Sequence, residues 1–350
     1  MGPKTIKIGN KRVGEGYPVL IIAEAGVNHN GDIEKAKKMI KIAAESGADA
    51  IKFHTYKTEE IMIKDTPQVE YALKATGESS FYNMAKKLEL KETDFEELIN
   101  LAKSYGILFL STPFDEGSAD FLEKLGVLFF KTPSGELINY PFLKHIAKKN
   151  LPMIVSTGMS TIEEVKGAVE AIKREGNDQI VLLHCVSNYP ANFESINLKS
   201  IVKLKEEFNF LTGYSDHTLG IIAPSIAVAL GACVIEKHFT LDKNLLGPDH
   251  QASLEPEELR KMVKLIRKTE KALGEKIKKP LETELDVQKV IRKSIIAAKE
   301  IKKDSLIEKE ALTFKRPGTG ILPKDVEIVI GKKAKRDIKI DEIIKWEYIE

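Results

Sequence analysis

The feature that most constrains the fold is a short apolar run, rich in β-branched residues, that recurs eight times between residues 19 and 240. Amphipathic stretches such as IEKAKKMIKIAAESG (residues 33–47), with apolar positions about 3.6 residues apart, separate the runs. Strands that alternate with helices indicate parallel βαβ units. The eight predicted strands are residues 19–26, 50–56, 107–113, 128–134, 152–158, 180–187, 210–218 and 232–240.

Each run begins apolar and ends in polar or charged residues. An open doubly wound sheet would concentrate such residues at one switch point, whereas a closed barrel carries its active site around the whole C-terminal rim. The pattern therefore predicts an α/β fold with a (β/α)₈ TIM barrel. The polar residues at the eight run ends are Glu24, Lys52, Ser111, Lys131, Ser156, His184, Asp216 and His238.

The pattern of apolar and polar residues changes after the predicted barrel. We predict a barrel domain over residues 1–274, a polar linker over 275–289 and a small β-rich domain over 290–350, in which turn residues such as Pro317 and Gly318 separate short apolar runs. About 60 residues is small for an independent core, so this domain is expected to pack on the barrel or on a second subunit.

Composition narrows the function classes. A net charge of +2 gives no global field for nucleic acid or a membrane. We expect no signal peptide and no spanning segment, because no apolar stretch is long enough. Cys185 and Cys233 lie inside apolar runs, as expected of buried thiols in a reducing compartment. A cytoplasmic protein is predicted.

Two lysines stand where apolar strand residues would continue, Lys52 in IKFHTY and Lys131 in FFKTPSGE. A lysine there is costly without an anionic partner, so we interpret the pair as a clamp for a phosphate or carboxylate. The alternatives are pairing with a barrel carboxylate and, for Lys131, a Schiff base as in metal-free aldolases. Hydroxyls on the same rim could complete an anion site or merely cap helices: Ser111, Thr112, Ser134, Ser156 and Ser187.

Two histidines at the ends of adjacent predicted strands argue against a metal-free Schiff-base mechanism. His217 follows Asp216 at the end of the seventh run and His238 stands at the end of the eighth, so their side chains should meet on the rim. Two nitrogen ligands with oxygen donors nearby suit Mn²⁺ or Mg²⁺ better than a closed structural Zn²⁺ site. The alternative is a pair of hydrogen-bonded rim histidines, and His184 could be a satisfied core histidine.

Three carboxylates follow strands on the same rim. Glu24 interrupts the first run, Glu136 follows the fourth and Asp249 follows the eighth. Such residues beside a basic clamp could bind sugar hydroxyls or act in acid–base catalysis, and each could instead form a salt bridge with a rim lysine.

These segments together resemble the sialic acid synthase (N-acylneuraminate synthase) family. The matching stretches are IIAEAGVNHNGD (21–32), IKF (51–53), KTPSGE (131–136), STGM (156–159), LLHCVSNYP (182–190), GYSDHTLG (213–220), EKHFTLD (236–242) and GPDHQASL (247–254). KRPGTGI (315–321) and IGKKAKRDI (330–338) resemble the antifreeze-like (SAF) domain that closes these enzymes.

The resemblance implies a metal-dependent transferase that condenses phosphoenolpyruvate with an N-acylated mannosamine-type sugar. It also implies a domain-swapped homodimer, with His217 and His238 as metal ligands and Mn²⁺, Mg²⁺ or Co²⁺ as the metal. Glu136 resembles the carboxylate near the reacting carbons. Phosphoenolpyruvate contacts would be Lys52, Lys131, Ser134, Ser156, Ser187 and Ser215, and sugar contacts Glu24, Tyr189, Asp249 and, from the partner, Arg316.

Two departures from the family pattern stand out. His54 replaces a usual glutamine and could titrate near neutral pH or bind metal, and Ser187 stands where some members have asparagine. Three questions stay open at this stage. The acceptor could be N-acetylmannosamine, giving N-acetylneuraminate, or a 6-deoxy-2,4-diacetamido mannose, giving a legionaminate. The chain could be a synthase of other sugar acids, or a non-catalytic carbohydrate-binding protein.

Overall fold

The computed structural model describes residue 2 and residues 4–350, and the chain divides into two compact units, Met1–Gly274 and Glu275–Glu350. The first unit contains all eight predicted strands at the predicted places. Their bounds are β3 Leu20–Gly26, β4 Ala50–Thr55, β5 Leu108–Pro113, β6 Phe130–Thr132, β7 Met153–Ser156, β8 Ile180–Cys185, β9 Leu211–Asp216 and β10 Val234–His238.

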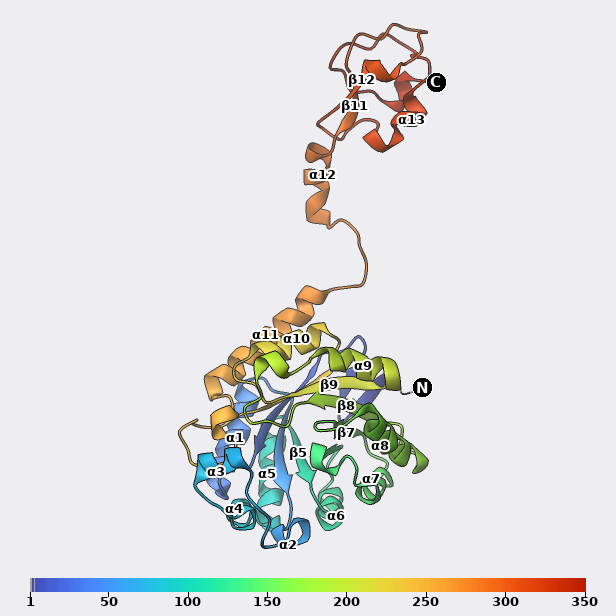
Figure 1. The fold of residues 1–350 in the computed structure, drawn as a ribbon. Coiled ribbons are helices and arrows are strands. Elements are labelled where there is room, and N and C mark those ends of the chain that lie inside the picture. Colours follow the sequence, from blue (N-terminus) through green and yellow to red (C-terminus); the bar gives the residue numbers. More distant parts are fainter. Residues whose placement is uncertain (1, 3) are drawn as a thin grey trace. The chain divides into compact units, whose positions relative to one another are not determined.

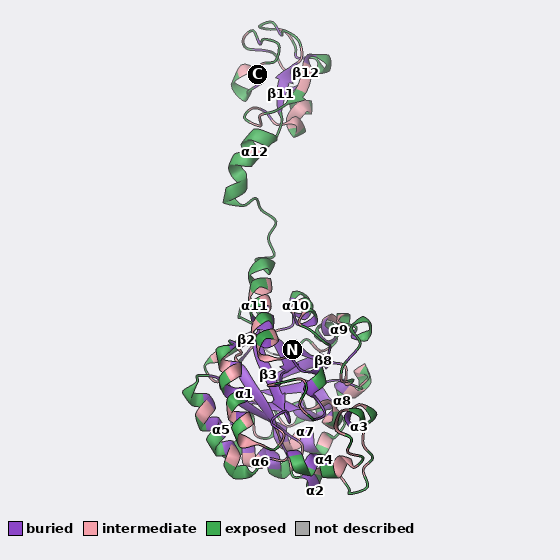
Figure 2. Cartoon of the chain, turned by 90° about the vertical axis from the view of Figure 1, so that its left-hand side faces the viewer, coloured by how far each residue is buried: buried purple, intermediate pink, exposed green. Residues whose placement is uncertain are grey.

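The eight strands form one sheet in the order β5-β4-β3-β10-β9-β8-β7-β6, and the pairings are parallel. The first and last strands of this order, β5 and β6, contact each other, so the sheet curls into a nearly closed barrel. Figure 2 shows the strands as the buried centre of the unit, with helices around them that expose one face. The TIM-barrel prediction is confirmed.

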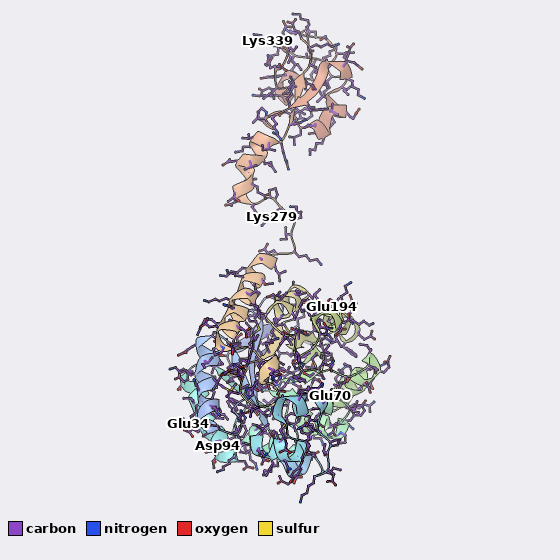
Figure 3. The ribbon with its side chains drawn as sticks, turned by 60° about the vertical axis from the view of Figure 1, so that its left-hand side comes forward. Glu34, Glu70, Asp94, Glu194, Lys279 and Lys339 are labelled. Carbon is purple, nitrogen blue, oxygen red and sulfur yellow. The ribbon has the colours of Figure 1, made fainter. Side chains whose placement is uncertain are left out.

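Helices follow the strands, as a (β/α)₈ pattern requires (Figure 1). Figure 3 shows charged side chains such as Glu34 and Asp94 on the outer surface of this layer. The α-helices are α1 Ile33–Glu45, α2 Thr58–Ile61, α3 Glu70–Thr76, α4 Phe81–Leu88, α5 Glu92–Ser104, α6 Glu116–Lys124, α7 Tyr140–Ala147, α8 Ile162–Arg174, α9 Lys199–Phe208, α10 Ile222–Ala229 and α11 Pro256–Leu273; 3₁₀ turns are η1 Ser134–Glu136, η2 Phe193–Ser195 and η3 His250–Ala252.

A hairpin that the sequence analysis missed precedes the barrel. Strands β1 (Thr5–Ile8) and β2 (Lys11–Gly14) pair antiparallel. Ile6, Ile8 and Val13 join the apolar cluster inside the barrel, which includes Leu20 and Val234 near the start of their strands. Burying these side chains closes the N-terminal end of the barrel, so the polar rim at the other end is left as the open one.

A second unpredicted element lies between β4 and α5. Three short helices, α2, α3 and α4, fill this connection, which exceeds the two to six residues usual for such loops. Ala72, Met84 and Leu88 pack with Val27 of the first strand–helix loop in a small apolar cluster. This cluster holds the insertion against the rim.

The second unit is built around isoleucine and alanine side chains, among them Ile295, Ile307, Ile338 and Ile344. Regular strand is confined to the antiparallel pair β11 and β12, and other pairing consists of isolated bridges such as Ile301 with Ile338. The predicted linker contains a 3₁₀ turn and most of a helix. The elements are η4 Glu282–Glu284, α12 Leu285–Ile291, β11 Ser294–Ala297, η5 Lys309–Ala311, β12 Leu312–Lys315, η6 Pro323–Asp325, α13 Val326–Val329 and η7 Trp346–Tyr348.

Within the residues that the structure describes, no helix combines the length and apolarity needed to cross a bilayer.

Candidate active site

A cavity of about 440 Å³ opens at the C-terminal ends of the barrel strands. Side chains that alternate along each strand reach it, since every second residue points into the barrel. The structure brings together around this cavity twelve of the residues predicted from the sequence. They are Glu24, Lys52, Thr112, Lys131, Ser134, Ser156, Ser187, Tyr189, Ser215, His217, His238 and Asp249.

The two rim lysines meet a carboxylate that the sequence analysis did not single out. Glu236 of β10 lies 3.8 Å from Lys52 Nζ and 3.6 Å from Lys131 Nζ. Ser215 Oγ donates a 3.0 Å hydrogen bond to the same carboxylate. Burial alone would raise the pKa of Glu236, but the two lysines and this hydrogen bond outweigh it and hold the pKa below its usual range. Glu236 is therefore an anion between two cations.

Lys52 has further partners. Its Nζ lies 2.6 Å from Glu24 Oε2 and donates to Thr112 Oγ1 at 2.8 Å. Burial lowers the pKa of Lys131, although Glu236 opposes this shift. Pairing with barrel carboxylates, which the sequence left open, is thus present. Both lysines also line the cavity, so they can face an anion bound there.

The two predicted metal ligands lie side by side, with 5.4 Å between their ring centroids. His217 Nδ1 is 2.6 Å from the carbonyl oxygen of Val186. Because a carbonyl only accepts, Nδ1 must carry the proton, and Nε2 is left with its lone pair. In metal sites, a carbonyl that accepts from one ring nitrogen typically orients the histidine so that the other nitrogen faces the metal.

One ring nitrogen of His238 has no hydrogen-bond partner among the described residues. Its Nδ1 is buried without a hydrogen-bond partner in the described part of the chain, and it lies 3.9 Å from Asp249 Oδ2. Burial lowers the pKa of both His217 and His238, which keeps the rings neutral and able to ligate. Among the described residues no three His, Cys, Asp or Glu side chains gather as a ready ligand set. A cation held by these two ring nitrogens would therefore need water or substrate in its remaining positions.

Two carboxyl groups beside the histidines have raised pKa values. Burial raises the pKa of Glu24, and burial together with the charge of Glu24 raises the pKa of Asp249 to about 7. The Asp249 carboxyl can therefore exchange protons with a substrate near neutral pH.

Serines of neighbouring strand ends converge on one glycine. Gly158 N donates to Ser134 Oγ at 3.0 Å, and Ser134 Oγ lies 3.0 Å from Cys185 Sγ. A Cβ at Gly158 would collide with Ser134, Cys185 and Ser187. The glycine thus lets hydroxyl groups crowd beside Lys131, as an anion site needs.

His54 does not behave as expected. Its Nε2 lies 2.9 Å from Glu24 Oε1, and burial and the charges of Lys52 and Lys131 hold its pKa well below the usual value. Titration near neutral pH, which the sequence suggested, is therefore wrong. A neutral His54 can instead donate a hydrogen bond to Glu24.

Three predicted site residues do not line the cavity. Ser111 hydrogen-bonds Thr55 at 2.6 Å, because the strand alternation turns it toward the helix layer and turns Thr112 inward. Glu136 lies in η1, beside Ser134 and Gly135 of the lining, and accepts a hydrogen bond from Asn139 at 2.6 Å. Arg316 belongs to the second unit, where its Nε donates to the carbonyl of Ile291. The expectation that Ser111 faces the anion site is therefore wrong, whereas Thr112, the other hydroxyl predicted on this strand, lines the cavity.

Comparison with known proteins assigns the family. Residues 39–278 match the model described as the NeuB family, and residues 292–350 match the SAF domain. The chain belongs to the NeuB family. The family model covers most of the barrel, and the SAF model covers the second unit beyond α12, so the resemblance seen in the sequence is confirmed over both.

Three relatives illustrate the family. N,N'-diacetyllegionaminic acid synthase of Legionella pneumophila is 48% identical over 347 residues, with 98% of each chain covered. Human N-acetylneuraminate-9-phosphate synthase is 36% identical, covering 97% of this chain and 94% of its own. The crystal structure of an N-acetylneuraminic acid synthetase from Leptospira borgpetersenii matches with a TM-score of 0.74 and 38% identity, covering 82% of this chain and 95% of that one. This chain is therefore an enzyme of the sugar-acid synthase type, and a non-catalytic role is set aside.

Proposed function

We propose that this NeuB-family enzyme condenses phosphoenolpyruvate with an N-acylated mannosamine-type sugar and water. The products are a nine-carbon sugar acid of the sialic-acid type and inorganic phosphate. One observation carries the proposal: two buried lysines and a set of hydroxyls converge on one end of a cavity whose other residues include a pair of neutral histidines.

Phosphoenolpyruvate fits the lysine end. Its carboxylate and phosphate are anions, and Lys52 and Lys131 would offset their charge. Hydroxyl groups would donate to the remaining oxygens, and their sources are Thr112, Ser134, Ser156, Ser187 and Ser215. Glu236, between the lysines, fixes the positions of both ammonium groups.

The aldehyde of the open-chain sugar would lie at the histidine end. Tyr189 packs on His217 with 4.1 Å between ring centroids, and Asp249 and Glu24 offer carboxyl groups to sugar hydroxyls. A divalent cation on His217 and His238, for which Mn²⁺ is our first choice and Mg²⁺ and Co²⁺ also suit, would supply Lewis-acid polarisation of the aldehyde oxygen.

The reaction balances without an oxidant or reductant. C3 of phosphoenolpyruvate attacks the aldehyde carbon, and the aldehyde oxygen takes a proton to become a hydroxyl. Water adds at C2, the bond between C2 and the bridging oxygen breaks, and phosphate leaves. The lysines stabilise the departing phosphate, and Glu136, beside the lining, is the residue we predict to guide the water.

The acceptor is one of two sugars. N-acetylmannosamine would give N-acetylneuraminate, and 6-deoxy-2,4-diacetamido mannose would give a legionaminate. The 48% identity to a diacetyllegionaminic acid synthase supports the second. Synthases of shorter sugar acids from phosphorylated sugars would need added cations for the second phosphate.

We also propose a domain-swapped homodimer in the cytoplasm, where phosphoenolpyruvate is made and where free thiols such as Cys185 persist. Arg316, exposed on the second unit, would then contact the sugar in the barrel of the partner. Mixing an Arg316→Ala subunit with a Lys131→Ala subunit should restore part of the activity that each lacks alone. Absence of complementation would contradict the exchange of domains.

The proposal is tested by phosphate release from phosphoenolpyruvate in the presence of Mn²⁺. We expect release only when an N-acylated amino sugar is added, with a product whose mass is that of sugar, phosphoenolpyruvate and water less phosphate. Release that ignores the sugar would indicate a phosphatase and contradict the proposal. Trapping of a pyruvate adduct on Lys131 by borohydride would favour the Schiff-base aldolase instead.

A further inference from the structure

The cavity has two chemically different halves. One half carries the lysines, hydroxyls, histidines and carboxyl groups described above. The other half is formed largely by the inserted helices α2–α4, together with Val27, Tyr56 and Phe114. We name the part of the lining contributed by residues 58–88 the insertion lobe.

The insertion lobe is apolar. Its cavity-facing members include Met62, Tyr71, Phe81 and Met84. All of residues 58–88 are described, and none of those that line the cavity is charged; the Tyr71 hydroxyl is the one polar side-chain group that they bring. A hydroxyl buried against such a surface loses hydrogen bonds to water, and a phosphate there would be an unpaired dianion.

An aromatic path joins the two halves. Tyr71 of α3 stacks on Tyr189 with 5.2 Å between centroids, and Tyr189 packs in turn on His217. A sugar with its aldehyde beside His217 would therefore extend its far end along Tyr189 toward the insertion lobe. The lobe is continuous with the reacting end of one cavity, which identifies its occupant as the remote end of the same substrate.

We propose that the insertion lobe is the specificity subsite for the end of the acceptor remote from the aldehyde. It selects an apolar, unphosphorylated end: a C6 methyl rather than a hydroxymethyl or phosphorylated group, with the methyl of an acylamido group beside it. This inference rests on the proposed function, because it assumes that the barrel binds an acceptor sugar. It assigns specificity to Met84 and Phe81, whose apolar side chains line the lobe.

The expected discrimination follows from what an apolar pocket can do. Such a pocket disfavours an added hydroxyl by roughly 10–100-fold, whereas an unpaired phosphate should be rejected by a larger factor. We therefore expect kcat/KM for 6-deoxy-2,4-diacetamido mannose to exceed that for N-acetylmannosamine by roughly 10-fold or more. The 6-phosphate of N-acetylmannosamine should be the poorest of the three.

The test compares these three sugars with the full-length enzyme, phosphoenolpyruvate and Mn²⁺, and adds two variants. Met84→Gln places an amide in the lobe and should reduce the preference for the 6-deoxy sugar by about 10-fold. Leu73→Gln makes the same kind of change on α3, at a side chain that is 41% exposed and does not line the cavity, and should leave the preference unchanged.

The outcomes separate the two claims. One outcome is phosphate release that requires a sugar and yet shows equal kcat/KM for the 6-deoxy and 6-hydroxy acceptors. This result would overturn the specificity role of the insertion lobe and leave the proposed function standing. A preference that Met84→Gln and Leu73→Gln alter equally would also overturn it. Absence of release with every sugar would overturn the proposed function and this inference together. Should Met84→Gln fail to fold, Phe81→Asn at the half-buried start of α4 tests the same contact.

Discussion

The barrel contains ion pairs that are buried, whereas the second unit has ion pairs that are exposed to solvent. The barrel buries lysines and carboxylates, including a Lys237–Asp216 pair at 2.7 Å with neither side chain exposed. In the second unit, pairs such as Lys299–Glu308 at 3.2 Å have both partners more than half exposed. Buried ion pairs are costly to desolvate and rarely add net stability. The Lys52–Glu24 pair lines the cavity and can face a substrate there, whereas the Lys237–Asp216 pair lies outside the lining.

The two units also differ in their histidine content. All seven histidines of the chain lie in the first unit, and the single tryptophan, Trp346, lies in the second. The barrel therefore holds every imidazole group, including the two proposed metal ligands, whereas the second unit is built around an isoleucine-rich core. The lone tryptophan also gives a fluorescence signal for the second unit alone.

The largest effect should come from the barrel histidines. His217→Ala removes one of two proposed ligands, so we expect Mn²⁺ binding to be lost and turnover to fall by at least roughly 10³-fold. Mn²⁺ binding is measured by electron paramagnetic resonance and turnover by phosphate release. His145→Ala, on α7 outside the cavity, is the matched control. A His217→Ala enzyme that keeps both metal and turnover would show that the ligand assignment is wrong.

Glu136 lies beside the cavity lining and not in it, so its substitution tests whether a residue in that position takes part in catalysis. If it guides the attacking water, Glu136→Gln should lower kcat by roughly 10²–10⁴-fold with little change in KM. Steady-state kinetics measure this, with Glu194→Gln on the exposed surface as control. A change below about 2-fold would indicate that the carboxylate serves only its hydrogen bond to Asn139.

Buried and exposed ion pairs should differ in their effect on stability. Asp216→Ala leaves Lys237 buried without its partner and should cost about 3–5 kcal/mol. Glu308→Ala removes an exposed pair and should cost under about 1 kcal/mol. Urea titration of the full chain resolves the two, with far-ultraviolet circular dichroism following mainly the helical barrel and Trp346 fluorescence following the second unit. Equal losses of unfolding free energy in the two variants would contradict the expected difference between buried and exposed ion pairs.

The pH dependence of stability should also differ between the units. Burial lowers the pKa of His29 to about 3. A folded pKa below the unfolded value of about 6.5 contributes stability above pH 6.5 that is lost as the pH falls. The raised pKa of Asp249 acts with the opposite sign, so the effect of His29 is best isolated with a variant.

We expect His29→Asn to remove pH dependence of about 1.1 kcal/mol for each pH unit between 6.5 and 5. The free energy of unfolding of the barrel at each pH, in wild type and variant, measures this. The Trp346 transition should be the same in both chains, because the second unit contains no histidine among its residues 275–350. Identical slopes for the barrel in the two chains would contradict a neutral, buried His29.

Much of the fold was predictable because its signal repeats. Eight apolar runs with polar ends define the barrel, and each corresponds to an observed strand. The β1–β2 hairpin and the helices α2–α4 were missed because each occurs once and is short. Their positions depend on apolar contacts with distant segments, such as Met84 with Val27, which local periodicity does not encode.

The site was predictable where strand alternation was applied in full. Glu236 stands two residues before His238 and so shares its face, and this spacing could have identified it. The same rule would have kept Thr112 and removed its neighbour Ser111 from the predicted rim hydroxyls. The low pKa of His54 could not be read from the sequence, since it depends on burial and on Lys52 and Lys131 in three dimensions.

The central claim is that this cavity joins phosphoenolpyruvate to a sugar with cleavage of the carbon–oxygen bond. The most direct test uses phosphoenolpyruvate labelled with ¹⁸O in the bridging position, incubated with the enzyme, Mn²⁺ and 6-deoxy-2,4-diacetamido mannose. The account predicts that the label leaves with inorganic phosphate, where the ³¹P resonance shifts. Label retained in the organic product, or phosphate released without the sugar, would contradict it.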